Sequence, residues 1–202
     1  MKVINPIDDI LDNKNKVKLL RYMVMHPSGV ATGRRLAKEL GMNHATCMNA
    51  LNSLHEAGIV DRKRVGSATV YEVARDTVVY KDLLKPLFKK EAGLLREATK
   101  ILTRGLDEKV LGAFLFGSVA KGEETPGSDT DILLVVKDDV DKEEANEKLN
   151  ENALEASKVF HTGFDVILYT KGEFERRKKR GHPFVKEALS HAVPLKMETH
   201  IG

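Results

Sequence analysis

Residues 114–136 read FLFGSVAKGEETPGSDTDILLVV, and this stretch decides the fold of the second half of the chain. It opens in a short apolar run that ends at Gly117-Ser118, a pattern typical of a buried strand followed by a turn. Asp129 and Asp131 come next, and a second apolar run, 132–136, follows them. Because residues two apart on a strand point to the same face, the two carboxylates are predicted to project together, within reach of the Gly-Ser turn.

A pair of neighbouring carboxylates predicts a metal site. The two charges repel each other unless a cation lies between them or a proton neutralises one. Mg²⁺ suits such hard oxygen ligands, and it usually takes one or two protein carboxylates together with phosphate oxygens of a substrate. A third carboxylate, Asp165, interrupts the apolar run 164–169, where an unpartnered charge would be costly to bury. We therefore predict that Asp129, Asp131 and Asp165 are catalytic residues that hold two Mg²⁺ ions.

The motifs Gly117-Ser-Val-Ala-Lys-Gly122 and Ser128-Asp-Thr-Asp131, with Asp165 on a later strand, resemble the DNA polymerase beta-like nucleotidyltransferase superfamily. The chain looks most like the minimal nucleotidyltransferase branch, in which Gly-Ser-x-Ala-Arg-Gly precedes Ser-Asp-x-Asp. Lys121 stands where arginine is commoner, which keeps the positive charge but loses bidentate phosphate binding. The resemblance extends from roughly Leu83 to the end of the sequence.

The resemblance implies a reaction and a set of binding residues. It implies transfer of a nucleotide from an NTP to a hydroxyl, with ATP as the donor and adenylylation as the outcome. The acceptor would be a small molecule or a protein, such as a helical toxin-like partner. Nucleotide binding is assigned to Gly117, Ser118, Lys121 and Ser128. Two alternatives stay open: an ordinary turn beside a surface pair of aspartates, and a catalytically silent domain that senses nucleotide within a transcription regulator.

Length and composition indicate a globular chain of one or two domains, with 202 residues in all. A single cysteine, Cys47, excludes an intrachain disulfide and fits a reducing compartment. No apolar run is long enough to span a bilayer, and the start of the chain lacks the pattern of a secretory signal. We therefore expect a cytoplasmic protein without a membrane partner.

Three helices are predicted in the first part of the chain. Asn13, Thr32 and Asn43 have side chains that favour the N-cap position, and each precedes a helical pattern. The third helix, residues 44–57, is predicted to bury four residues on one face: Cys47, Ala50, Leu51 and Leu54.

A basic hairpin follows these helices. Two strand-like runs, 59–64 and 68–73, are joined by a short turn that contains Gly66. Helices and hairpin in this order, with the phrase Leu54-His-Glu-Ala-Gly-Ile-Val60, resemble a winged helix-turn-helix. We therefore predict a winged helix-turn-helix DNA-binding domain over residues 1–80.

The predicted DNA interface has two parts. Short polar side chains on the third helix suit the major groove, and basic side chains on the hairpin suit the phosphate backbone. The first 80 residues carry 12 Lys and Arg against 8 Asp and Glu, whereas the remainder carries 21 against 22. A solvated face or a protein-docking module is the alternative, and a homodimer is expected because winged helices often read paired half-sites. The predicted DNA-binding residues are Thr46, Asn49, Asn52, Ser53, Arg62, Lys63 and Arg64.

Residues 81–202 are predicted to form the nucleotidyltransferase domain, with residues 81–104 as a linking helix capped by Asp82. The resemblance implies a small mixed sheet flanked by helices, so the fold class of the whole chain is α/β (α+β). The apolar stripe of the linking helix would pack on the catalytic sheet or on a second subunit. A basic cluster, residues 176–180, most simply faces water, and the alternative is that it holds a triphosphate or an acidic partner.

Overall fold

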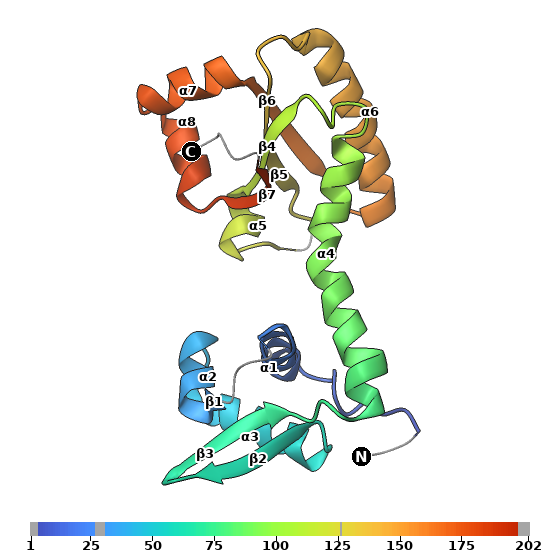
Figure 1. Ribbon diagram of the computed structural model, residues 1–202, viewed down its shortest axis with the longest axis vertical. Coiled ribbons are helices and arrows are strands. Elements are labelled where there is room, and N and C mark those ends of the chain that lie inside the picture. Colours follow the sequence, from blue (N-terminus) through green and yellow to red (C-terminus); the bar gives the residue numbers. More distant parts are fainter. Residues whose placement is uncertain (1–3, 27–30, 126, 198–202) are drawn as a thin grey trace. The chain divides into compact units, whose positions relative to one another are not determined.

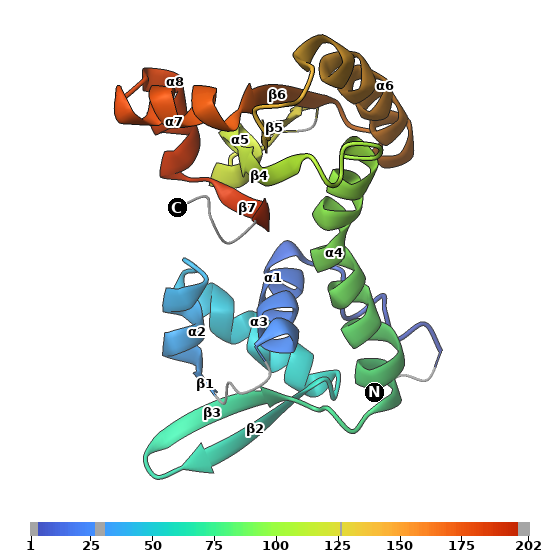
Figure 2. The ribbon, with the colours of Figure 1, turned by 45° about the horizontal axis from the view of Figure 1, so that its top comes forward.

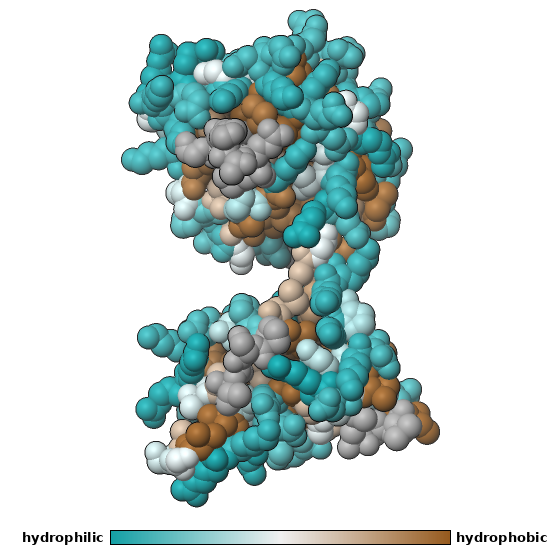
Figure 3. Space-filling view, viewed as in Figure 1, coloured by the Kyte–Doolittle hydropathy of each residue, from teal (hydrophilic) through white to brown (hydrophobic). Residues whose placement is uncertain are grey.

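The computed structural model describes residues 4–26, 31–125 and 127–197 (Figure 1). The chain divides into two compact units, residues 1–92 and 93–202. The division falls inside helix α4, Lys85–Leu102, about twelve residues after the boundary expected from the sequence at residues 80 and 81. No helix within the described ranges combines the length and the apolar character that crossing a bilayer requires. Hydrophilic side chains cover most of the visible face of each unit (Figure 3).

The first unit is a winged helix-turn-helix, as the sequence predicts. Its three helices are α1, Lys14–Met25, α2, Gly33–Glu39, and α3, His44–Glu56. The predicted caps are confirmed: the side chains of Asn13, Thr32 and Asn43 each accept a hydrogen bond from a backbone N–H of the first turn. Strands β1, Ala31–Thr32, β2, Val60–Val65, and β3, Ala68–Val73, form an antiparallel sheet in the order β1-β3-β2.

The core of this unit forms around α3. The helix buries Cys47, Ala50, Leu51 and Leu54, the same four residues that its periodicity predicts. Burial raises the pKa of the Cys47 thiol, and its Sγ lies 3.6 Å from the carbonyl oxygen of Gly33. Cys47 is therefore a packed, unreactive core residue.

The start of the linking helix belongs to the first unit. A π-helical turn, η1, spans Val79–Leu84 before α4, and Leu84 and Phe88 pack in the same core as α3. The prediction that Asp82 caps this helix is wrong, because the turn already begins at Val79. The hydroxyl of Thr77 instead accepts a hydrogen bond from the N–H of Tyr80 at 3.2 Å.

The second unit contains a four-stranded mixed sheet in the order β6-β5-β4-β7, which confirms the predicted mixed sheet. Strand β4 is antiparallel to β5 and β7, whereas β5 and β6 are parallel and joined by helix α6. The strands are β4, Val110–Phe116, β5, Thr130–Val136, β6, Phe164–Thr170, and β7, Val193–Met197. The helices are α5, Gly117–Lys121, α6, Lys142–Phe160, α7, Lys171–Lys179, and α8, Pro183–Ser190.

Helices cover both faces of this sheet (Figure 2). Ile132 and Leu134 of β5 pack in a core that includes Leu149 of α6. The alternate residues of β5, Leu133 and Val135, pack in a second core with residues of α7 and α8. Because strand side chains alternate, every residue of β5 and β6 can be assigned to the α6 face or to the α7–α8 face.

Candidate functional site

The three predicted aspartates meet at one end of the sheet. In the register of β5 with β6, Asp131 is the direct partner of Asp165. In the register of β4 with β5, Asp131 is the partner of Phe116, the residue before the Gly-Ser turn. Asp129 lies in the loop immediately before β5. The parallel β5–β6 pair thus places residues 34 positions apart side by side, as the crossover through α6 predicts.

Two glycines leave room for the carboxylates. Gly117 has a φ of +73°, and a Cβ added there would overlap Oδ2 of Asp131. A Cβ added at Gly163, just before β6, would overlap Oδ1 of Asp129. Gly117 is a predicted nucleotide-binding residue, whereas no role was predicted for Gly163. In the structure, each of the two glycines is packed against an aspartate.

The electrostatics of the site follow from this crowding. The pKa of Asp131 is raised above its ordinary value, first by burial, then by the charge of Asp165 and then by that of Asp129. A cation between these oxygens would remove the repulsion, so the donor set fits Mg²⁺. As the side chains stand, no three His, Cys, Asp or Glu residues in the described ranges form a ready metal-binding group. A metal ion held by all three carboxylates would require the aspartate side chains to rotate.

The predicted nucleotide-binding residues have different surroundings. Gly117 and Ser118 begin α5 directly beside Asp131, where backbone N–H groups and a hydroxyl suit phosphate oxygens. Lys121 forms an ion pair with Glu187 of α8 at 3.6 Å. Ser128 organises the loop before β5, because its hydroxyl accepts a hydrogen bond from the N–H of Thr125 at 3.0 Å. The structure thus groups Gly117 and Ser118 with the aspartates and gives Lys121 and Ser128 protein partners.

The predicted DNA-binding residues of α3 also divide. Thr46 and Asn49 are exposed and line a hollow that also contains Lys16 of α1. Asn52 lines a different hollow of about 650 Å³ between α3, α2 and the hairpin. Three further residues of this second hollow, Arg34, His44 and Thr69, were not predicted. Each is the first or second residue of a predicted helix or strand, so its position near the end of an element could have indicated it.

Ser53 lies in a third setting, a hollow whose charged residues are mostly acidic. Asp9, Asp12 and Glu56 line it beside Ser53, together with Lys16. Negative side chains oppose an approaching phosphate backbone. The surroundings of Ser53 therefore differ from those of Asn52, although the two residues are adjacent in sequence.

The hairpin separates the three predicted cations by face. Arg62 pairs with Tyr71 and Arg64 with Thr69 across the β2–β3 ladder. Tyr71 is buried under the helices, so Arg62 and Arg64 share the helix-facing side of the hairpin. Lys63 points to the opposite side, where its Nζ donates a hydrogen bond to Glu72.

Comparison with known proteins gives a family match to the second half of the chain and several similar solved structures. Residues 95–194 match the family model of the nucleotidyltransferase domain, whereas no curated protein matches the chain. One similar solved structure is a toxin–antitoxin with AMP-PNP, with 18% identity and a TM-score of 0.39 over 52% of this chain and 74% of that chain. Another is a homodimeric winged helix-turn-helix DNA-binding domain from Mycobacterium bovis, with 19% identity and a TM-score of 0.36 over 48% of this chain and 85% of that chain.

The family match spans every residue of the acidic site described above, from Gly117 to Asp165. The candidate active site therefore lies within a segment of the chain, residues 95–194, that matches the nucleotidyltransferase domain family.

Proposed function

We propose that the chain is a magnesium-dependent nucleotidyltransferase that transfers AMP from ATP to a hydroxyl of a protein or a small molecule. The observation that carries this proposal is the convergence of Asp129, Asp131 and Asp165 at one sheet end. There Asp131 packs against Gly117 and Asp129 against Gly163. The first protein acceptor to test is a helical toxin-like partner.

Each residue of the site has a proposed role. Gly117 and Ser118 bind phosphate oxygens of the NTP through backbone N–H groups and the hydroxyl. Asp129 and Asp131 would hold both Mg²⁺ ions, and Asp165 would complete one of the two sites. When bound, the ions lower the pKa of the acceptor hydroxyl and neutralise charge on the leaving group. The acceptor oxygen attacks the α-phosphorus, the bond to pyrophosphate breaks, and Asp165 takes the hydroxyl proton.

Transfer of label from α-³²P-ATP tests the reaction. Asp129→Asn and Asp131→Asn are expected to reduce transfer at least about a hundredfold, because each removes a proposed ligand of both ions. Asp139→Asn is the matched control, since Asp139 is an exposed aspartate that follows the far end of β5. Transfer by the double aspartate variant at the wild-type rate would refute the proposal. ATP binding without transfer to any tested acceptor would favour the nucleotide-sensing regulator instead.

We further propose that the winged helix binds DNA upstream of the gene that encodes this chain and regulates transcription of that gene. The protein would act in the cytoplasm. The basic, helix-facing side of the hairpin and the polar hollow around Asn52 support this. An electrophoretic shift on that DNA, repeated at rising salt, tests it. A shift that is absent, or that does not weaken as salt rises, would contradict DNA binding.

A further inference from the structure

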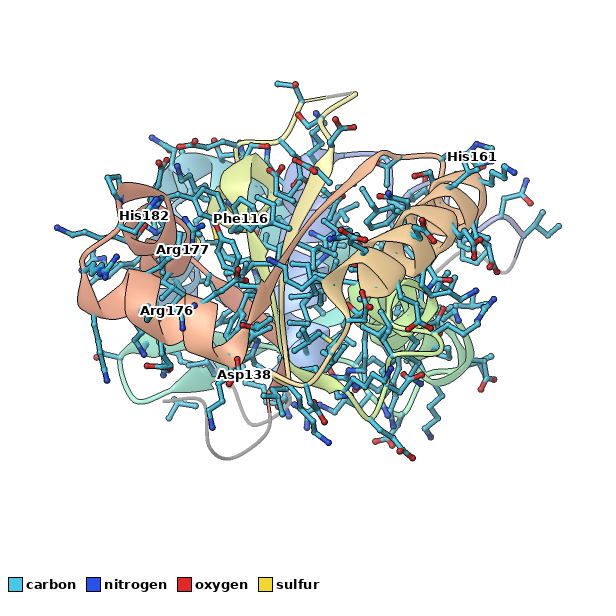
Figure 4. The ribbon with its side chains drawn as sticks, turned by 90° about the horizontal axis from the view of Figure 1, so that it is seen from above. Phe116, Asp138, His161, Arg176, Arg177 and His182 are labelled. Carbon is cyan, nitrogen blue, oxygen red and sulfur yellow. The ribbon has the colours of Figure 1, made fainter. Side chains whose placement is uncertain are left out.

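A hollow between α7 and the start of α8 is a separate feature of the second unit. It measures about 470 Å³ and we call it the α7 hollow. Its lining is rich in positive charge, and the residues that form it are Glu173, Arg176, Arg177, Arg180, Gly181, His182 and Pro183. Figure 4 shows Arg177 and His182 close together. Arg176 lies nearer to Asp138 than these two residues do.

Two contacts hold Arg177 at the base of this hollow. Its guanidinium lies over the ring of Tyr169, with 4.7 Å between the central carbon and the ring centroid. Its Nη1 lies 3.3 Å from Nε2 of His182. A guanidinium only donates hydrogen bonds, so Nε2 of His182 is the acceptor in this pair. The hydrogen of the neutral imidazole is then on Nδ1.

The Nδ1 atom of His182 is buried and has no hydrogen-bond partner. Within the described ranges, it is the one buried side-chain nitrogen or oxygen in that condition. A buried donor without an acceptor is unfavourable, and native proteins usually supply a partner. His182, which lines the α7 hollow beside three arginines, therefore carries an N–H group that lacks an acceptor and is closed to solvent.

The negative groups nearby already have partners. Glu173 is the acidic residue of the lining, and its carboxylate binds Nζ of Lys142 at 2.8 and 2.9 Å and the N–H of Thr170 at 3.1 Å. Asp138 lies near Arg176 and accepts a hydrogen bond from the N–H of Gly172 at 2.7 Å. Arg180 lines the hollow and is exposed, and α8 begins at Pro183, so its N-terminus adds a positive partial charge. The hollow thus keeps an excess of positive charge.

The α7 hollow and the aspartates lie on the same face of the sheet. Ile167 and Tyr169 of β6 pack on the α7–α8 side, and the alternation of the strand places Asp165 on that side too. Tyr169, under the Arg177 guanidinium, is four residues along β6 from Asp165, which corresponds to about 13 Å. This separation is within the length of one nucleotide-sized substrate.

We propose that the α7 hollow binds a phosphate group of a substrate of the proposed transferase, through Arg177 and Arg180, and that a movement of the His182 ring opens Nδ1 to the same phosphate. The assignment to a substrate rests on the proposed transferase function, whereas phosphate binding itself does not. The phosphate belongs either to the nucleotide donor or to the acceptor, and the same guanidinium and imidazole donors would hold it in both cases.

Calorimetric titration of the full chain with pyrophosphate, in buffer without phosphate or divalent metal, tests the hollow. Arg180→Ala is expected to weaken the affinity about tenfold, the loss of one charge-assisted hydrogen bond. Lys179→Ala is the matched control on the same helix, because Lys179 is exposed and does not line the hollow. Equal weakening by the two variants would overturn the proposal, since it would reveal only general attraction to a basic surface.

The His182 imidazole supplies a readout that does not depend on a variant. In long-range ¹H–¹⁵N spectra, pyrophosphate is expected to shift the Nδ1 resonance of His182 and to leave that of the exposed His26 unchanged. An unmoved Nδ1 resonance at saturation would overturn the proposal. Neither measurement involves nucleotide transfer. A chain that binds pyrophosphate but transfers no nucleotide would therefore support phosphate binding by the α7 hollow and contradict the proposed transferase function.

Competition identifies the source of the phosphate. In the Asp129→Asn variant, displacement of pyrophosphate from the hollow by ATP would assign the phosphate to the donor. Simultaneous binding of ATP and pyrophosphate would assign it to the acceptor.

Discussion

Gly163 shows how a residue without a side chain shapes the acidic site. An added methyl would overlap Oδ1 of Asp129, and the backbone there is not left-handed, so the conflict is purely steric. We expect Gly163→Ala to displace the Asp129 carboxylate and to lower transfer about tenfold or more, because small misplacements of catalytic groups are costly. Gly93→Ala is the control, since a Cβ there meets no atom within 4 Å. Transfer assays and melting curves on both variants make the comparison. Equal activity of the two would contradict the proposed role of Asp129.

Arg64 and Lys63 are neighbours in sequence but lie on opposite faces of the hairpin. Arg64→Ala is expected to weaken DNA binding and to reduce the salt dependence of the affinity by about one unit of slope, as loss of one phosphate contact does. Lys63→Ala should change both much less, because Lys63 is paired with Glu72 on the other face. Fluorescence anisotropy on labelled upstream DNA over a salt series measures both slopes. If Lys63→Ala had the larger effect, the docking face of the hairpin would be the opposite one.

At the scale of elements, Glu173 joins the beginnings of α6 and α7. Hydrogen bonds from Lys142 hold the pKa of Glu173 below its ordinary value, and the N–H of Thr170 and the charge of Arg177 contribute. Because the folded-state pKa is lowered, the stabilisation is complete above the unfolded pKa of about 4.3 and is lost as the pH falls through the folded value. We expect Glu173→Ala to destabilise the chain by about 1 kcal/mol at pH 7, through the lost cap and ion pair.

Denaturant unfolding at pH 7 and near pH 3 measures this difference. The stability gap between Glu173→Ala and the wild type should shrink at the lower pH, where the wild-type carboxylate is protonated. A gap that stays constant would assign the effect to packing rather than to charge. Lys148→Ala, which removes an exposed pair with Glu151 inside α6, is the control and should show little effect at either pH.

The elements that the sequence predicts well are those with a local signal. The buried face of α3 follows from helical periodicity, and the start of α7 follows from Thr170 and Glu173, which form a capping box. The convergence of the aspartates was also predictable, because a helical crossover makes β5 and β6 parallel neighbours.

Other features depend on contacts that the local sequence does not encode. The pairing of Lys63 with Glu72 requires the register of the hairpin, and the room at Gly163 requires the position of Asp129. The apolar stripe of α4 serves two cores, with Phe88 in the first and Leu102 in the second. Periodicity shows that a helix is amphipathic but does not name the core against which each turn packs.

At the scale of the whole molecule, we predict a homodimer. Leu83 and Leu87, one helical turn apart in the first unit, are 38% and 45% exposed, an apolar surface that a second copy would cover. Light scattering after size exclusion should give twice the chain mass, and Leu87→Glu should shift the population to monomer. Leu154→Glu, at another exposed leucine on α6, is the control and should remain dimeric. A wild-type monomer at all accessible concentrations would refute the prediction.

The pairing of Asp131 with Asp165 makes the spacing of the chain before β6 as important as its composition. Adding or deleting a single residue near Thr162 would move the β6 ladder by one step and place Phe164 or Val166 opposite Asp131. The third carboxylate would then turn toward α6, while the backbone ladder itself could still form. An indel of this kind would abolish the proposed catalysis without changing any of the three aspartates, so a motif search would still score the altered chain as intact.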